Sequence, residues 1–343
     1  MKKYYFTIII ILFITSYSIG LASEYTESVD STQIALVLSY EITPQKKSSS
    51  GLKNAAIDKF KLTVNLPQTI EGRQEITKIA YEPQPSRTFM ENSNKYAEYD
   101  LSIPREKTII KIRIEAVAFR YDLTTAVKKQ NQGSLSQTEL RTFLMHERMI
   151  EKDDPAIQKI ARTIEDQTEL DIVKKIYKYG IRNITPDVSK SKGIGAVETA
   201  KTKRGKCIDY CDLFVALCRA KNIPARVAAG YKANFSVTPK HSWVEVYFNE
   251  YGWVPFDVSM RSDTPDQLLD KRFHNLPAQY LYFTNLRNDH VLHNNYYFCY
   301  PTWDMNLRKV INPIVEKIKF EKPVQKKHDS LKLEQAGKTL PNK

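Results

Sequence analysis

Long apolar runs are almost absent from this chain of 343 residues. The exception is the start, "MKKYYFTIIIILFITSYSIGLAS", which has basic residues, an apolar stretch through Ile14, and small residues at Gly20 and Ala22. This pattern predicts a cleaved secretory signal peptide over residues 1–22. An uncleaved anchor is the alternative, although polar residues interrupt a run that is short for a bilayer span of about 20 residues. No later stretch is long enough to cross a membrane, so we expect an exported chain, periplasmic or extracellular, that is not an integral membrane protein once the signal is removed.

Nucleic-acid-binding motifs are also missing. The sequence has no helix-turn-helix, no aromatic RNP-type strand and no zinc-finger spacing, and we expect no nucleic-acid partner. The formal net charge is +13, and loss of Lys2 and Lys3 with the signal peptide would leave +11 (13 minus 2). This excess of positive charge favours acidic neighbours, such as an envelope polymer or an anionic membrane surface, with solubility alone as the alternative.

Cysteine is scarce, with four residues in the chain, although an exported protein meets an oxidising environment. Cys211 and Cys218 lie about 10 Å apart along one predicted helix, too far to pair with each other. Cys299 could reach one of them, but we expect no disulfide. A zinc site formed by Cys207, Cys211 and His241 would lack a fourth ligand at finger-like spacing. No acidic loop of the EF-hand type occurs either. The sequence therefore predicts no metal and no other cofactor.

The sequence is 42% hydrophobic and 27% charged, enough to bury two ordinary cores. Between about residues 32 and 119 the apolar residues alternate with a period of two. "FKLTVNLP" places Phe60, Leu62 and Val64 on one face, and "IIKIRIEAVAF" repeats the pattern. Stretches rich in proline and serine separate these runs. We therefore predict an antiparallel β-sandwich over residues 24–125.

Helical spacing begins at Gln137. Asp154 or Asp153 can cap a helix that has Pro155 just inside its start, and "ELDIVKKIYKYGI" predicts a second helix that stops near Gly180. We expect a helical connector over residues 126–165 and a second domain over 166–315. A charged, flexible tail should occupy 316–343.

Three of the cysteines lie in "RGKCIDYCDLFVALCRA", residues 204–220. After Cys207 the segment is apolar nearly all round, which is typical of a helix buried inside its domain. Cys207 would begin this helix, where the partial positive charge of the N-terminus favours the reactive thiolate. Cys211 and Cys218 would lie within the helix as small apolar side chains. Cys207 is therefore the candidate nucleophile.

A base and a carboxylate follow in "KHSWVEVYFNEYGWVPFDVSM", which predicts a hairpin that turns between Asn249 and Gly252. Pairing Tyr247 with Gly252 puts Asp257 opposite Ser242 and beside His241. In such a pair the carboxylate holds the imidazole in one tautomer and stabilises its charged form.

Together, "GKCIDYCDLFVALCRAKNIPARVAAGY", "HSWVEVYF" and "GWVPFD" resemble the core of the transglutaminase-like superfamily. The resemblance extends over about residues 30 to 312 and is closest to exported bacterial members with an N-terminal β-sandwich. It implies an α+β chain in which 166–315 is a papain-like catalytic domain, with a cysteine-bearing helix packed on an antiparallel sheet. It also implies a catalytic triad of Cys207, His241 and Asp257.

The resemblance further implies an oxyanion site formed by the Cys207 backbone N–H and an upstream side chain. Asn183 and Tyr179 are the candidates for the second donor, and Trp243 and Tyr231 are candidates for the substrate cleft.

The predicted function is acyl transfer or hydrolysis on peptide or protein amides through a thioester. The alternative is a noncatalytic protein for binding or assembly in the cell envelope that keeps the fold.

Overall fold

The computed structural model describes residues 30–42, 60–101, 108–126, 135–187, 189, 193–233, 240–294, 299–302 and 311–321. The predicted signal peptide and residues 322–343 of the predicted tail lie outside these ranges. The fold is α+β with antiparallel sheets, which confirms the predicted class. Across the described ranges, no helix combines the length and apolar character that a bilayer crossing needs.

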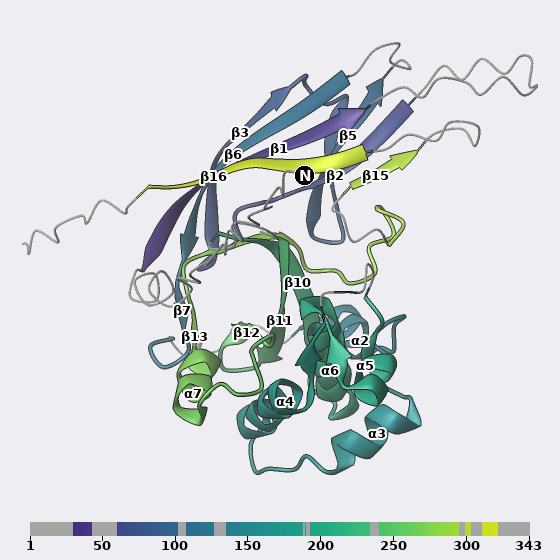
Figure 1. Ribbon diagram of the computed structural model, residues 1–343, viewed down its shortest axis with the longest axis vertical. Helices are drawn as coiled ribbons and strands as arrows, with labels where there is room; N and C mark the ends of the chain where they lie inside the picture. The colour runs from purple at the N-terminus through teal and green to yellow at the C-terminus, as the bar shows by residue number, and fades with distance from the viewer. Residues whose placement is uncertain are drawn as a thin grey trace, which may run out of the picture.

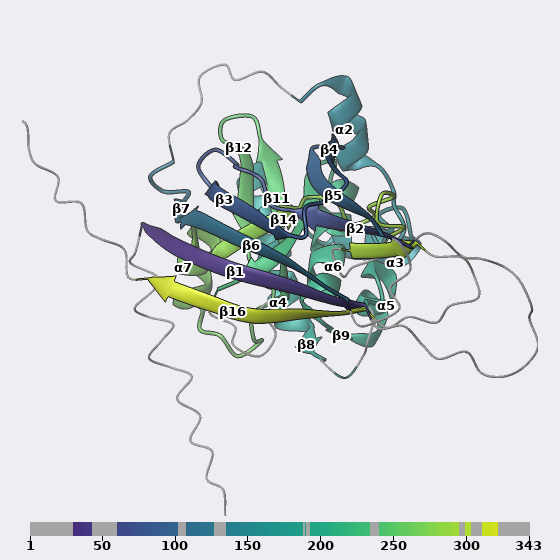
Figure 2. The ribbon, with the colours of Figure 1, turned by 90° about the horizontal axis from the view of Figure 1, so that it is seen from above.

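Two four-stranded sheets, ordered β16-β1-β6-β3 and β15-β2-β5-β4, form the N-terminal sandwich (Figure 1, Figure 2). The strands are β1 (Ser31–Ile42), β2 (Phe60–Leu66), β3 (Gln74–Glu82), β4 (Arg87–Glu91), β5 (Asn94–Leu101), β6 (Thr108–Phe119), β15 (Cys299–Thr302) and β16 (Ile311–Glu321). Alternate residues of β6, including Ile110, Ile112 and Ile114, are buried between the sheets. The period-two pattern therefore marked the buried face correctly.

The last described strand departs from the predicted domain limits. β16 pairs along β1, and β15 pairs with β2, so both belong to the sandwich. The predicted limits, a second domain over 166–315 and a flexible tail over 316–343, are therefore wrong for these residues. β16 is an edge strand, where charged residues are common because they discourage further pairing. The lysines and glutamates of β16 give it the charged composition of a flexible tail, which explains the wrong prediction.

The second domain packs helices against a sheet ordered β12-β11-β10-β14. Its strands are β10 (Ala225–Lys232), β11 (Lys240–Phe248), β12 (Gly252–Phe256) and β14 (Tyr280–Thr284). Its helices are α3 (Pro155–Arg162), α4 (Glu169–Asn183), α5 (Ala196–Thr202), α6 (Cys207–Ala220) and α7 (Asp266–His274). Asp154 caps α3 as predicted, whereas α4 runs three residues past Gly180. No helix was predicted over the residues of α5.

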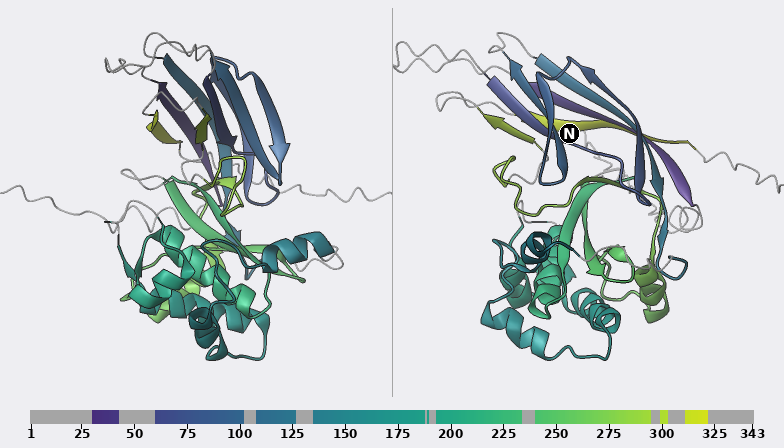
Figure 3. Two further views of the ribbon diagram at one scale, coloured as in Figure 1. Left: turned by 90° about the vertical axis from the view of Figure 1, so that its right-hand side faces the viewer. Right: turned by 180° about the vertical axis from the view of Figure 1, so that it is seen from behind.

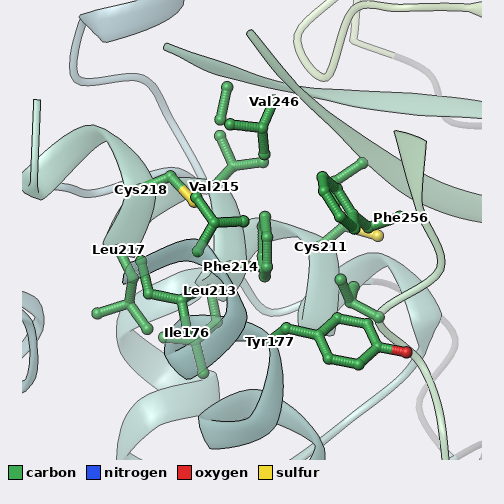
Figure 4. Packing of buried hydrophobic residues seen from close by; sticks show 14 of the residues in the cluster. Ile176, Tyr177, Cys211, Leu213, Phe214, Val215, Leu217, Cys218, Val246 and Phe256 are labelled. Carbon is green, nitrogen blue, oxygen red and sulfur yellow. The ribbon is translucent and has the colours of Figure 1, made fainter. Parts of the chain in front are cut away.

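Helix α6 is the centre of this domain. Twelve of its residues are buried, from Ile208 through Arg219, and the helix packs against α3, α4, α5 and the sheet. Figure 4 shows its side chains beside Ile176 and Tyr177 of α4 and Val246 and Phe256 of the sheet. α3 contributes Ile157 and Ala161 to the same core, so it belongs to this domain and not to a separate connector. Helix α2 (Gln137–Leu144) buries no residue and fits the connector prediction better.

The sheet of the second domain lies between the sandwich and the helices (Figure 1, Figure 3). Ala229 and Tyr231 of β10 and Leu281 and Phe283 of β14 join the sandwich core. Because side chains alternate along a strand, the even-numbered residues of β10 point to the opposite face. The short pairs β7 (Tyr121–Asp122) with β13 (Asn275–Leu276) and β8 (Thr185–Pro186) with β9 (Arg204–Gly205) complete the described fold.

Candidate active site

Cys207 is the first residue of α6, as predicted, and its side chain is partly exposed. The helix start is fixed by the buried carboxylate of Asp209. One oxygen accepts from the Lys206 backbone N–H at 2.8 Å, and the other accepts from the Ile194 N–H at 2.6 Å. A Cβ on Gly205 would lie 2.6 Å from the Asp209 Cβ, so glycine is required at this close approach. These contacts fix the start of α6 and therefore the position of the Cys207 thiol.

His241 is the second residue of β11, and its imidazole lies against Cys207. The imidazole and the backbone N–H of Ser242 both hydrogen-bond the sulfur. His241 pairs across the sheet with Gly230, and a Cβ at that glycine would lie 1.9 Å from the Leu281 carbonyl oxygen. β14 therefore runs close against the backbone of β10 at the residue that pairs with His241.

The hairpin that brings Asp257 to His241 has a register one residue away from the predicted one. Phe248 pairs with Gly252, which places Asp257 opposite Trp243 and not opposite Ser242. Directly opposed residues share a face, and Trp243 shares its face with His241. The observed register therefore directs Asp257 to the imidazole, whereas the predicted one would have turned it away. Pro255 causes no bulge because β12 is an edge strand.

Asp257 holds His241 at the centre of a dense set of hydrogen bonds. Its Oδ2 lies 3.0 Å from His241 Nε2 and 3.1 Å from Lys232 Nζ, and it also accepts from the Tyr280 hydroxyl. Its Oδ1 accepts from the backbone N–H and the hydroxyl of Ser259 at 3.2 and 2.9 Å. With Nε2 committed to Asp257, Nδ1 is the imidazole nitrogen that remains for Cys207.

The electrostatics of this cluster favour charge separation. Burial raises the pKa of Cys207, but the hydrogen bond and the positive charge of His241 outweigh it, and the net pKa lies below the ordinary value. Burial lowers the pKa of His241, whereas the charge of Asp257 and hydrogen bonds to Asp257 and Cys207 raise it to about 9. Burial also opposes ionisation of Asp257, but His241 and Lys232 hold its pKa well below the usual range. A thiolate paired with an imidazolium is the form that these shifts support.

The other two cysteines of α6 have the opposite environment. Cys211 and Cys218 have no exposed surface and lie among apolar side chains (Figure 4). Burial raises the pKa of both thiols. They pack as small apolar residues, as the sequence predicted.

The remaining predicted site residues lie elsewhere. Trp243 is wholly buried with its ring 6.3 Å from the His241 ring, and Tyr231 packs toward the sandwich, so neither presents an open cleft wall. The Asn183 side chain donates to the Tyr179 carbonyl at 2.9 Å. The Tyr179 hydroxyl accepts from Lys203 Nζ at 2.9 Å. The hydrogen bonds of both candidates thus run to α4 and Lys203, not to Cys207. Neither candidate is therefore placed as the second oxyanion donor.

Sequence reasoning missed Lys232, Tyr280 and Ser259 around Asp257. Lys232 was detectable in principle, because it shares the face of Gly230, which pairs with His241. Tyr280 was not, since its pairing with Lys232 depends on a strand almost fifty residues further along.

Comparisons with known proteins give a family match within the second domain and similar solved structures. Residues 158–258 match the family model described as Transglutaminase-like superfamily. A stretch of 81 residues is 37% identical to the uncharacterized protein YebA of Bacillus subtilis. That match covers 20% of this chain, and it spans only 11% of the length of that curated relative.

Among solved structures, a protein from Cytophaga hutchinsonii, described as a candidate cysteine protease, has a TM-score of 0.54 at 16% identity. The match covers 84% of this chain and 93% of that one, and it shows a shared fold. The periplasmic domain of TgpA from Pseudomonas aeruginosa is a weaker likeness, with a TM-score of 0.37 at 14% identity over 74% of this chain and 94% of that one.

Proposed function

The chain belongs to the transglutaminase-like superfamily through its second domain, and from this premise we propose that it is a cysteine-dependent enzyme acting on peptide or protein amides. The observation that carries the proposal is the convergence of Cys207, His241 and Asp257 from α6, β11 and the end of β12. A nucleophile, a base and a residue that orients the base within hydrogen-bonding reach are the parts that nucleophilic catalysis needs.

In the proposed reaction the Cys207 thiolate attacks the carbonyl carbon of an amide and forms a C–S bond. The charge that develops on the carbonyl oxygen is stabilised by the Cys207 backbone N–H, because the first N–H groups of a helix have no partner within it. The His241 imidazolium gives its Nδ1 proton to the amide nitrogen, the C–N bond breaks, and an amine leaves. The product of this half-reaction is a thioester on Cys207.

The second half-reaction returns the enzyme to its starting state. His241, now neutral, takes a proton from water or an acceptor amine as that nucleophile attacks the thioester. The C–S bond breaks and the thiolate is restored beside the imidazolium. Asp257 keeps its charge throughout and holds the ring by Nε2. We propose water as the principal acceptor, so the enzyme is a hydrolase more than a cross-linking transferase.

We also propose an exported location, with a peptide or protein of the cell envelope as substrate. The basic, apolar N-terminus and the excess of lysine and arginine support this location and an acidic neighbour.

Selective labelling tests the enzyme proposal. Wild-type protein is treated at neutral pH with an iodoacetamide probe, and labelled cysteines are identified by peptide mapping. We expect rapid modification of Cys207, slow modification of Cys211 and Cys218, and loss of the rapid phase in His241→Ala. Equal, slow labelling of all cysteines would instead support the noncatalytic alternative.

Substrate profiling then separates the reaction types. Fluorogenic peptide libraries and cross-linked envelope peptides report hydrolysis, and incorporation of a fluorescent amine reports transfer. Cys207→Ala is the blank for each assay. Predominant amine incorporation at physiological amine concentrations would contradict the preference for water.

A further inference from the structure

A buried lysine shares the carboxylate that orients His241. Lys232 ends β10 with 9% of its surface exposed, and its Nζ lies 3.1 Å from the same Asp257 oxygen that binds His241. Lys232 pairs across the sheet with Tyr280, whose hydroxyl donates to that oxygen as well. The ammonium also lies 4.9 Å from the centre of the Tyr280 ring.

The strand register explains this convergence. Gly230 pairs with His241, and Lys232 lies two residues further on the same face of β10. β14 then places Tyr280 directly opposite Lys232. The three donors to Asp257 Oδ2 therefore come from three adjacent strands, and the position of the lysine is fixed by the sheet and not by a flexible loop.

We propose that Lys232 is a positioning residue that sets the pH range in which Cys207 and His241 exist as a thiolate–imidazolium pair. The inference rests on the proposed function, because it assigns a role to Lys232 in the same site. Lys232 acts through Asp257 and does not need to touch the substrate.

The first reason is competition for one oxygen. A carboxylate offers about four lone-pair sites, two on each oxygen, yet Asp257 Oδ2 receives three donors. The ammonium draws on the negative charge that would otherwise stabilise the imidazolium alone. His241 in this site is therefore a stronger acid than it would be beside an unshared aspartate, and it gives its proton more readily to a leaving amine.

The second reason is charge balance in a buried site. With Cys207 and Asp257 negative and His241 and Lys232 positive, the four groups sum to zero. Without the ammonium, the same thiolate form would carry one net negative charge out of water, which is costly. Removal of Lys232 should therefore favour proton uptake by both Cys207 and His241.

Other ionisable groups face this cluster without supplying a second compensating cation at Asp257. They are Cys211 from α6, Tyr177 from α4, Tyr280 from β14 and Arg272 from α7. Burial is the largest influence on the two tyrosines and raises the pKa of each, so both stay neutral. Arg272 acts on Tyr280. Among the residues that the structure describes, Lys232 is the cation that contacts the Asp257 carboxylate in addition to His241.

The test is the pH dependence of Cys207 alkylation by iodoacetamide, which needs no knowledge of the substrate. Wild-type protein should show two inflections, one for formation of the thiolate and one for loss of the His241 proton. In Lys232→Met both inflections should move to higher pH, by on the order of one unit. Lys232→Gln, which keeps a donor but no charge, should move them in the same direction, whereas Lys232→Arg should restore the wild-type profile.

Lys78→Met is the matched control, because this exposed lysine pairs with Glu115 in the sandwich and lies on a different sheet. Its profile should equal that of the wild type. If Lys232 had only a structural role, its replacement would lower the labelling rate without moving both inflections of the pH profile to higher pH. Inflections at the wild-type pH in both Lys232→Met and Lys232→Gln would therefore overturn the inference. If His241→Ala leaves the wild-type profile unchanged, the proposed function itself fails, whatever the lysine variants show.

Discussion

Replacing Cys207 should expose a pH dependence of the free energy of unfolding that comes from His241 and that the Cys207 thiol opposes in the wild type. In the folded protein the pKa of His241 is raised from 6.5 to about 9. Between these values folded His241 keeps a proton that the unfolded chain has lost, so its contribution is full below about pH 6.5 and is lost as the pH rises toward 9. At 1.36 kcal/mol per pKa unit, the contribution is about 3 kcal/mol.

Cys207 acts in the opposite direction. Its folded pKa lies below the ordinary 9.0, so the folded chain loses the thiol proton at a lower pH than the unfolded chain does. This contribution grows as the pH rises. In the wild type, the contribution of Cys207 therefore opposes the loss from His241 as the pH rises.

Cys207→Ala removes one side of this balance. Its free energy of unfolding, relative to that of the wild type, should fall as the pH rises above about 6.5, by less than about 3 kcal/mol, because the variant also loses the Cys207 hydrogen bond that helps raise the pKa of His241. Urea denaturation at a series of pH values measures this difference, and other titrating groups are common to both proteins. Parallel curves for the two proteins would refute the thiolate–imidazolium pair.

Three further variants test the surroundings of the site. Asp257→Asn should lower the pKa of His241 toward its ordinary value, since it removes the charge that opposes desolvation, and an unchanged NMR titration of the imidazole would contradict this. Gly230→Ala should cost about 3 kcal/mol or more, because its Cβ would lie 1.9 Å from a carbonyl oxygen of β14; an unaltered urea midpoint would count against the strand pairing. Cys218→Ser should cost about 1–3 kcal/mol by placing a hydroxyl in the apolar core, and equal thermal stability would dispute its burial.

Local patterns predicted most elements near the site. The apolar residues after Cys207 predicted a buried helix, and α6 begins at that residue. Asp154 and Pro155 fixed the start of α3 in the same way. Cap residues and apolar residues of this kind lie within a few positions of the helix start, where they act directly on the backbone conformation.

The pairing of strands that lie far apart in the sequence could not be predicted from such local patterns. The return of β16 to β1 joins residues almost three hundred positions apart, and composition alone suggested a tail. The hairpin register was wrong by one residue, although turn residues were recognised, because turn type and not composition determines which residues face each other. The contacts of Lys232 and Tyr280 with Asp257 depend on both the register and a third strand.

The central claim is that Cys207 is a thiolate at neutral pH because of His241. The direct measurement is the ultraviolet absorbance of the thiolate, titrated in wild-type protein against Cys207→Ala as the blank. We predict that the Cys207 thiolate forms below the ordinary thiol pKa of 9.0, and that His241→Ala moves its formation to higher pH. A wild-type thiolate that appears only near the usual value, with no change in His241→Ala, would contradict the account.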